Sequence, residues 1–195
     1  GEIVIHGERM ADMKEKRLTI YRRKHLGYIF QMYNLIPNLT VKENIETGAY
    51  LSNDPLPLDD MLKTLGLWEH KDKIPNQLSG GQMQRVFLCR AIISSPKILI
   101  LDEPSTYVDA NFENEFYAVL GELNKTMSIV MVSHDLGTIC SYVKTIACVN
   151  GGLHYHESNL ITPEQLKLYN CPIELISHGT VPHRVLLKHD RTIEN

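Results

Sequence analysis

Two neighbouring carboxylates, Asp102 and Glu103, directly follow a short apolar run, Ile98 to Leu101. The run is half β-branched and stops abruptly before Pro104, which is typical of a buried parallel strand that delivers polar residues to the carboxyl edge of a sheet. Ligands of open α/β sheets bind at that edge. A carboxylate there can hold a divalent cation, and a second one can activate a water molecule.

A second candidate site precedes these carboxylates in the chain and consists of Ser79, Gly80, Gly81 and Gln82. Ser79 and Gln82 have the spacing of a capping box, which predicts that a helix begins here and runs to Ile93. The free N–H groups and the positive end of such a helix face outward. A glycine-lined helix N-terminus binds anions, phosphate above all, so the two sites together predict nucleotide chemistry.

The elements that must position these residues alternate between strand and helix. The pattern predicts strands over 2–6, 26–30, 98–101, 128–132 and 145–149, the last closing a hairpin with 153–156. It predicts helices over 11–24, 40–50, 58–67, 82–93, 111–123, 136–142 and 163–169, with a loose tail after them. Thr40 and Glu43 have the spacing of a capping box at the start of the helix 40–50. This alternation indicates an α/β fold with a parallel sheet, in which the helical stretch 40–93 forms an inserted subdomain.

Length and composition are those of an ordinary globular domain. The chain has 195 residues and a net charge of −3, which gives no reason to expect a nucleic-acid partner. The four cysteines, Cys89, Cys140, Cys148 and Cys171, show no C-x-x-C spacing, so we expect reduced thiols in the cytosol. No apolar run is long enough to span a bilayer, and the first residues do not form a signal peptide.

The order of five features resembles the nucleotide-binding subunit of ABC transporters over essentially the whole chain. The features are Gln31, the L-S-G-G-Q segment from Leu78 to Gln82, the I-L-I-L-D-E-P segment, Asp109, and His134 in S-H-D. The resemblance implies a P-loop NTPase-like α/β fold, with a mostly parallel sheet, flanking helices and an inserted helical subdomain. It implies one domain, 1–195, with core residues 1–31, the helical subdomain 32–94, the α/β core 95–150, and a hairpin and tail 151–195.

This resemblance also implies ATP and Mg²⁺ as ligands and ATP hydrolysis as the reaction. Asp102 would hold Mg²⁺, and Glu103 would orient and activate the attacking water. His134 would contact the γ-phosphate. Gln31 would touch Mg²⁺ and water, and would link the core to the helical subdomain.

Partners follow from the same resemblance. Ser79, Gly80, Gly81 and Gln82 would close over ATP held by a second nucleotide-binding subunit in a head-to-tail dimer, with Asp109 at the interface. The segment around Leu35 to Pro37 would receive a transmembrane permease subunit. The chain would then lie at the cytoplasmic face of the plasma or inner membrane as a peripheral protein.

One motif of the family does not occur in these 195 residues. The phosphate-cradling G-x-x-x-x-G-K-[ST] is absent, because no glycine is followed by lysine. We therefore expect an ABC ATPase without its N-terminal strand, P-loop and helix. Such a chain should by itself bind ATP weakly, hydrolyse it negligibly, and expose a sheet edge or core face that invites aggregation.

The two halves resemble different subfamilies. Residues 21–51 resemble ATPases of lipoprotein-releasing or macrolide-type exporters, and the stretch from about Val86 onward resembles ATPases of zinc and manganese importers. The interpretation that we favour is divalent metal import, and a splice between the subfamilies near Pro75 to Val86 is a hypothesis for the mixture. The alternatives are an exporter ATPase of the first type, a non-hydrolytic docking module, and a soluble ABC ATPase of DNA repair or translation.

Five histidines in the C-terminal part raise the question of a metal site. They are His154, His156, His178, His183 and His189. His154 and His156 would share one strand face, but no carboxylate or cysteine is placed to complete a tetrahedral set. Exposed polar histidines on a hairpin and tail are the favoured interpretation.

Overall fold

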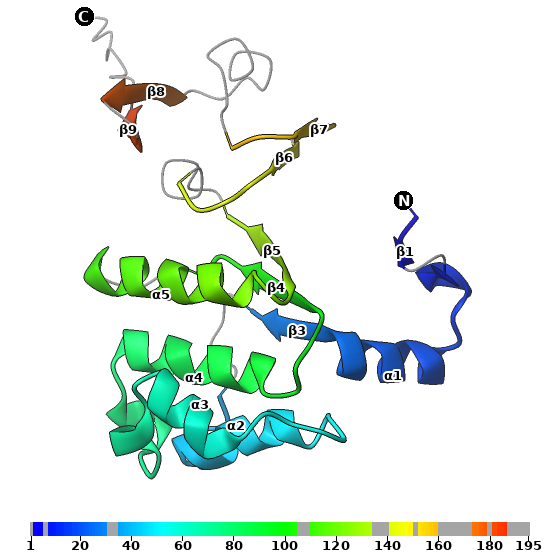
Figure 1. Ribbon diagram of the computed structural model, residues 1–195, viewed down its shortest axis with the longest axis vertical. Coiled ribbons are helices and arrows are strands. Elements are labelled where there is room, and N and C mark those ends of the chain that lie inside the picture. The colour runs from blue at the N-terminus through cyan, green and yellow to red at the C-terminus, as the bar shows by residue number, and fades with distance from the viewer. Residues whose placement is uncertain are drawn as a thin grey trace, which may run out of the picture. The chain divides into compact units, whose positions relative to one another are not determined.

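The computed structural model describes residues 2–5, 8–30, 35–104, 110–133, 141–149, 152–159, 173–178 and 181–186 (Figure 1). For residues 5, 8, 110–112, 173–178 and 181–186 the description is of the backbone alone. The chain divides into two compact units, Gly1–Val132 and Ser133–Asn195.

The first unit contains the elements that position both candidate sites. Its strands are β1 (Val4–Ile5), β2 (Glu8–Arg9), β3 (Leu26–Ile29), β4 (Ile98–Asp102) and β5 (Ser128–Val132). Its α-helices are α1 (Glu15–His25), α2 (Val41–Ala49), α3 (Leu58–Thr64), α4 (Gly80–Ile92) and α5 (Ala110–Leu123). Short 3₁₀ turns are η1 (Met10–Asp12), η2 (Trp68–His70) and η3 (Pro75–Gln77).

The central sheet is parallel, with the strand order β3-β4-β5. β4 is the middle strand, so its backbone is paired on both sides and its carboxyl end is held firmly. Leu99 and Leu101 of β4 are fully buried, and they share a core cluster with residues of α4 and α5 such as Leu88 and Phe116. The predicted α/β fold with a parallel sheet and flanking helices is therefore confirmed.

The opposite face of this sheet is open to solvent in the part of the chain that the structure describes. Tyr28, Ile100 and Val130 lie side by side across the three strands. Tyr28 is 41% exposed, Val130 51% and Val132, further along β5, 53%. Since parallel sheets are normally covered on both faces, this apolar surface is unusual.

Local sequence signals account for where the helices of the inserted segment begin. Thr40 caps α2, because its side chain accepts a hydrogen bond from the Glu43 N–H while Glu43 accepts one from the Thr40 N–H at 2.7 Å. The Thr40 N–H and the Thr40 hydroxyl both donate to the Glu43 carboxylate, which lowers the pKa of this carboxyl. The predicted capping box at Thr40 is confirmed, and it fixes the point at which the chain turns from a loop into α2.

Two glycines allow α4 to pack closely against its neighbours. A Cβ atom on Gly48 of α2 would lie 2.2 Å from the Arg90 carbonyl oxygen of α4. A Cβ atom on Gly27 of β3 would lie 2.6 Å from the Ala91 carbonyl oxygen. A side chain at either position would push α4 away, so these glycines dock α4 onto both α2 and the sheet. We call the L-S-G-G-Q segment from Leu78 to Gln82 the signature segment, and α4, which begins in it, the signature helix.

The second unit contains two antiparallel hairpins. β6 (Ile146–Val149) pairs with β7 (Leu153–His156), as the sequence predicts. β8 (Ile173–His178) pairs with β9 (Val181–Leu186), where the sequence predicted a loose tail, so that prediction was wrong. The predicted helices over 136–142 and 163–169 fall almost wholly outside the described residues.

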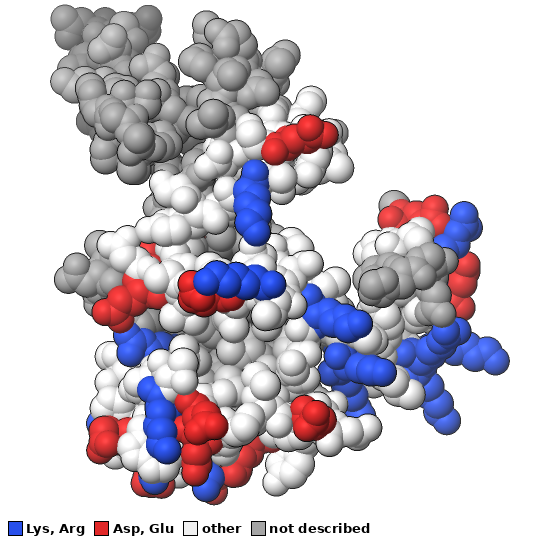
Figure 2. Space-filling model, in the orientation of Figure 1, with Lys and Arg blue, Asp and Glu red and all other residues white. Residues whose placement is uncertain are grey.

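Charge is distributed unevenly over the first unit. Lysines and arginines gather around α1, whereas both signs mix over the helical segment (Figure 2). The exposed cations of α1 are Lys16, Arg17, Arg22, Arg23 and Lys24. Among the described residues, no helix combines the length and apolar character needed to cross a bilayer.

Candidate functional site

The carboxylate pair lies at the carboxyl tip of the central strand. Asp102 is the last residue of β4 and lies in register with Val132, the last residue of β5. Its side chain is half-buried. This places a carboxylate at the ligand-binding edge of the sheet, as the sequence predicts, in a setting where its oxygens can hold a hard cation such as Mg²⁺.

Glu103 adopts a backbone conformation that is rare for a residue with a side chain. Its φ angle is +49°, in the left-handed region. Its N–H donates a hydrogen bond of 2.9 Å to the carbonyl oxygen of Val132, which keeps the chain attached to β5 for one residue beyond the strand. Strain of this kind persists where the surrounding structure holds it in place, and it clusters at functional sites.

The next residue, Pro104, is buried, and its carbonyl oxygen accepts a hydrogen bond from the side-chain amide of Gln84 on α4. The signature helix is thereby joined directly to the carboxylate tip. Gln84 was not among the site residues predicted from the sequence. The sequence does contain a signal for Gln84, because this residue is polar and lies on the inward side of a helix that otherwise packs through Val86 and Phe87.

The signature segment is capped as predicted. Ser79 Oγ accepts a hydrogen bond of 3.2 Å from the Gln82 N–H, and Gln82 Oε1 accepts one of 3.0 Å from the Ser79 N–H. Helix α4 consequently starts at Gly80, two residues earlier than the sequence analysis placed it. Within the described residues, no hydrogen bond engages the N–H groups of Gly80 and Gly81, so they remain available to an anion.

A histidine outside the motif steadies this cap. The Gln82 side-chain amide lies 2.9 Å from His70 Nε2, on η2. The two side chains are thus within hydrogen-bond distance, and η2 is tied to the start of α4. The sequence analysis missed His70, because only the fold brings η2 beside the start of α4.

The loop before α2 is organised by one buried amide. Asn44 is fully buried; its side chain accepts a hydrogen bond of 2.8 Å from the Ile36 N–H and donates to the carbonyl oxygens of Ile36, Leu39 and Thr40. These four bonds fold the stretch that includes Pro37 back onto α2. The sequence analysis marked this loop as a permease contact but did not identify the residue that shapes it.

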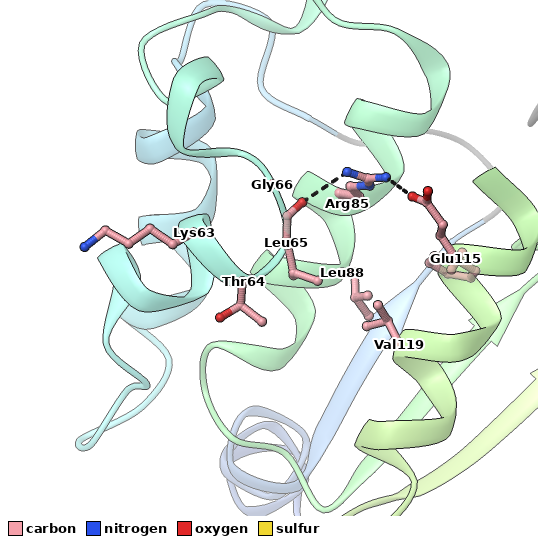
Figure 3. A pocket seen from close by; sticks show the side chains of 9 residues that line it. Lys63, Thr64, Leu65, Gly66, Arg85, Leu88, Glu115 and Val119 are labelled. Carbon is pink, nitrogen blue, oxygen red and sulfur yellow. Dashed lines mark hydrogen bonds and ion pairs between the residues drawn. The ribbon is translucent and has the colours of Figure 1, made fainter. Parts of the chain in front are cut away.

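A cavity of about 240 Å³ lies between the helical segment and α5 (Figure 3). Arg85 spans it, donating to the Leu65 carbonyl oxygen at 3.4 Å and pairing with Glu115 at 2.5 Å. None of the predicted site residues lines this cavity, and it is smaller than typical nucleotide-sized pockets. The cavity therefore marks where α4 and α5 pack against each other, and it is not a nucleotide site.

Comparison with known proteins agrees with this geometry. A family model described as "ABC transporter" matches residues 1–106, more than half of the chain. The chain belongs to the ABC transporter family. Its signature segment and carboxylate tip both fall inside the matched range.

Relatives of this ABC chain have names from several transport systems. The bacitracin export ATP-binding protein BceA of Halalkalibacterium halodurans is 40% identical over 162 residues, which are 80% of this chain and 64% of BceA. The lipoprotein-releasing system ATP-binding protein LolD of Bacteroides fragilis is 34% identical over 160 residues, 78% of this chain and 74% of LolD. A protein named for import is also among the relatives. The chain thus spans less than two thirds of the length of BceA.

A solved ABC structure has the same fold. The dimeric structure of a post-hydrolysis state of the ATP-binding cassette MJ0796, bound to ADP and Pi, superposes with a TM-score of 0.72. The match has 29% sequence identity and covers 83% of this chain and 75% of that one. The P-loop NTPase-like fold predicted from the sequence is confirmed by this neighbour.

Several predicted ABC site residues lie outside the described residues. These are Gln31, Asp109 and His134. Their roles remain predictions from the family motif. The structure does place Asp102 and Glu103 at one edge of the sheet, Ser79 to Gln82 at the start of α4, and the Gln84 amide as a direct link between the two segments.

The cysteine and histidine predictions are tested in part. Within the described stretches, neither Cys89 nor Cys148 is joined in a disulfide. No group of three or more potential metal ligands occurs among the described residues. His154 and His156 both lie on β7, and His154 is exposed whereas His156 is buried.

Proposed function

We propose that this chain supplies the hydrolytic carboxylates and the signature segment of an ATP-hydrolysing subunit in an ABC transporter. The observation that supports this most is the Glu103 carboxylate at the tip of the central strand, next to Asp102 and held in a left-handed conformation. In this proposal Glu103 is the general base that takes a proton from the attacking water, and His134 and Gln31 orient the phosphate and the water.

The residues present fit a Mg²⁺ ion. Asp102 offers a half-buried carboxylate at a sheet edge, and oxygen ligands of this type are those that Mg²⁺ prefers. When bound, the ion would neutralise charge on the phosphates. Asp102 would hold it, with the amide of Gln31 as a second ligand.

The proposed assembly is a head-to-tail dimer at the cytoplasmic face of a membrane. Gly80 and Gly81 would donate their N–H groups to ATP on the second subunit, and Asp109 would lie at that interface. The loop that Asn44 folds, from Leu35 to Thr40, would receive the permease. The dimeric state of the solved neighbour supports this arrangement.

The decisive experiment compares Glu103→Gln with Glu122→Gln in the complete transporter that contains this chain. Glu103→Gln should lower ATP turnover about 10²–10⁴-fold, because general-base catalysis contributes that much, and should leave ATP binding intact. Glu122 is an exposed carboxylate paired only with Lys125, so its variant should match the parent. Turnover that survives Glu103→Gln would overturn the assignment.

The 195-residue chain alone is a separate case. Its sequence contains no G-x-x-x-x-G-K-[ST] cradle, so we expect weak ATP binding and negligible turnover. Isothermal calorimetry with MgATP measures this directly. Tight binding would mean that other residues of the chain hold the triphosphate.

For the transported substrate, we propose divalent metal import, supported by the resemblance of the sequence after Val86 to ATPases of zinc and manganese importers. A second candidate is export or release, favoured by the similarity to BceA and LolD. Proteoliposomes that contain the complete transporter distinguish the two. ATP-driven uptake of Zn²⁺ or Mn²⁺ supports the first, and its absence together with drug efflux or lipoprotein release supports the second.

A further inference from the structure

Gln84 is a buried amide on α4 to which neither the motif nor the family match assigns a task. It is 5% exposed and lies two residues after Gln82, the last residue of the signature segment. Its Nε2 donates a hydrogen bond to the Pro104 carbonyl oxygen, 20 residues further along the chain. A long polar side chain is thus buried in order to reach the backbone immediately after Glu103.

The backbone at Glu103 needs support from both sides. A residue with a side chain is disfavoured at a φ of +49°, and a residue that precedes proline is normally extended. Two hydrogen bonds hold this backbone, one on the N-terminal side of the Glu103 side chain and one on its C-terminal side. The first is the bond from the Glu103 N–H to Val132, and the second is the bond from Gln84 to Pro104.

We propose that Gln84 is a positioning residue that holds Glu103 in its left-handed conformation and so aims the Glu103 carboxylate. This inference rests on the proposed function, in which Glu103 is the general base. Because Gln84 and the signature residues lie within two turns of one helix, a displacement of the α4 N-terminus moves the Gln84 amide with it. Nucleotide contact at Ser79 to Gln82 is therefore transmitted to Glu103 of the same chain.

In a head-to-tail dimer, the Gln84 bond would connect two different nucleotide sites. The signature segment contacts nucleotide on the partner subunit, whereas Glu103 serves the site of its own chain. The Gln84 bond then couples the two sites, since closure at one adjusts the general base of the other. A buried amide that only satisfied a carbonyl group would have no such effect on turnover.

The test uses three variants in the complete transporter that contains this chain. Gln84→Met keeps the length of the side chain and removes the donor, and Gln84→Leu removes the donor with a shorter apolar side chain. Val86→Ala is the matched control, because Val86 is fully buried on the same helix and, two residues after Gln84, does not share its face. Both Gln84 variants should lower kcat by roughly 10²-fold with KM for ATP unchanged, as expected for a displaced catalytic group.

Val86→Ala should lower the melting temperature at least as much as Gln84→Met, yet leave kcat unchanged. Loss of kcat in proportion to loss of stability across all three variants would overturn the positioning role. Unchanged kcat in both Gln84 variants, while Glu103→Gln abolishes turnover, would also overturn the positioning role. That result would leave the proposed function intact.

A second readout needs no nucleotide and can use the 195-residue chain. Hydrogen exchange of the Glu103 amide, measured by NMR, reports its bond to Val132. Gln84→Met should accelerate this exchange at least about 10-fold relative to the Leu99 amide within β4, and Val86→Ala should accelerate both amides equally. An unchanged Glu103-to-Leu99 ratio in Gln84→Met would refute the claim that Gln84 holds Glu103, whatever the outcome of the turnover assay.

Discussion

Asn44 provides the sharpest test of how the proposed permease-binding loop is built. Its side chain makes four hydrogen bonds to backbone groups of the loop and the first turn of α2, and it is fully buried. The informative change is Asn44→Leu, which keeps the number and branching of the side-chain heavy atoms and removes every hydrogen-bonding group. The loop from Leu35 to Thr40 should then lose its attachment to α2.

The magnitude follows from which backbone groups lose their only hydrogen-bond partner. Thr40 O keeps its helical bond from the Asn44 N–H at 2.8 Å, and Ile36 O keeps a bond from the Leu39 N–H at 3.2 Å. The Leu39 carbonyl oxygen and the Ile36 N–H remain unsatisfied. At about 1–3 kcal/mol for each buried unsatisfied group, we expect a loss of about 2–6 kcal/mol.

Urea denaturation followed by the fluorescence of Trp68 measures this loss. Trp68 is the one tryptophan of the chain and packs against the core of the first unit. With a denaturant slope of about 2 kcal/mol per molar, the midpoint should fall by roughly 1–3 M. The matched control is Thr47→Val, which removes a single hydroxyl bond to the Asn44 carbonyl within α2 and should shift the midpoint little. Equal midpoints for Asn44→Leu and Thr47→Val would refute the reasoning.

Four further outcomes are expected. Ser79→Ala removes the α4 cap and should cost about 1 kcal/mol in a thermal melt; an unchanged melting temperature would contradict the observed capping box. Burial raises the pKa of the Cys89 thiol to about 12, so iodoacetamide at pH 8 should modify partly exposed Cys148 well before Cys89, and peptide mass spectrometry showing equal rates would contradict this order. The unfolded thiol ionises first, near pH 9, so Cys89 should also make the folded state less stable as pH rises from there towards 12. Val130→Lys on the open sheet face should reduce light scattering by the 195-residue chain without lowering its melting temperature; a lowered melting temperature would show that Val130 is packed after all.

The sequence predicted most reliably those features that depend on neighbouring residues. The strand 128–132 was predicted with its observed bounds, and the capping boxes at Thr40 and Ser79 were found, because each involves residues only three positions apart. The predicted helix 58–67 is shorter in the structure and ends at Thr64. The β8–β9 hairpin was missed, although Gly179-Thr180 between the two runs has the composition of a two-residue turn.

Long-range contacts could not be predicted from the sequence. Gln84 and Pro104 are 20 residues apart, and Gln82 meets His70 across 12 residues. A side chain that serves a distant backbone group has no local pattern, since its partner is chosen by how the helix docks on the sheet. The same holds for Arg85, which joins Leu65 on one side of the cavity to Glu115 on the other.

The sequence by itself determined the order of chemical groups along the chain. It showed a glycine-lined helix start, then a buried strand, then two carboxylates, because residue type and spacing determine caps and strand ends locally. Only the tertiary structure decided how these groups are held. Packing of α4 against β3 and α2, through the close approach at Gly27 and Gly48, brings Gln84 to the strand tip. There the backbone hydrogen bonds on both sides of Glu103 determine the left-handed conformation that its own sequence disfavours.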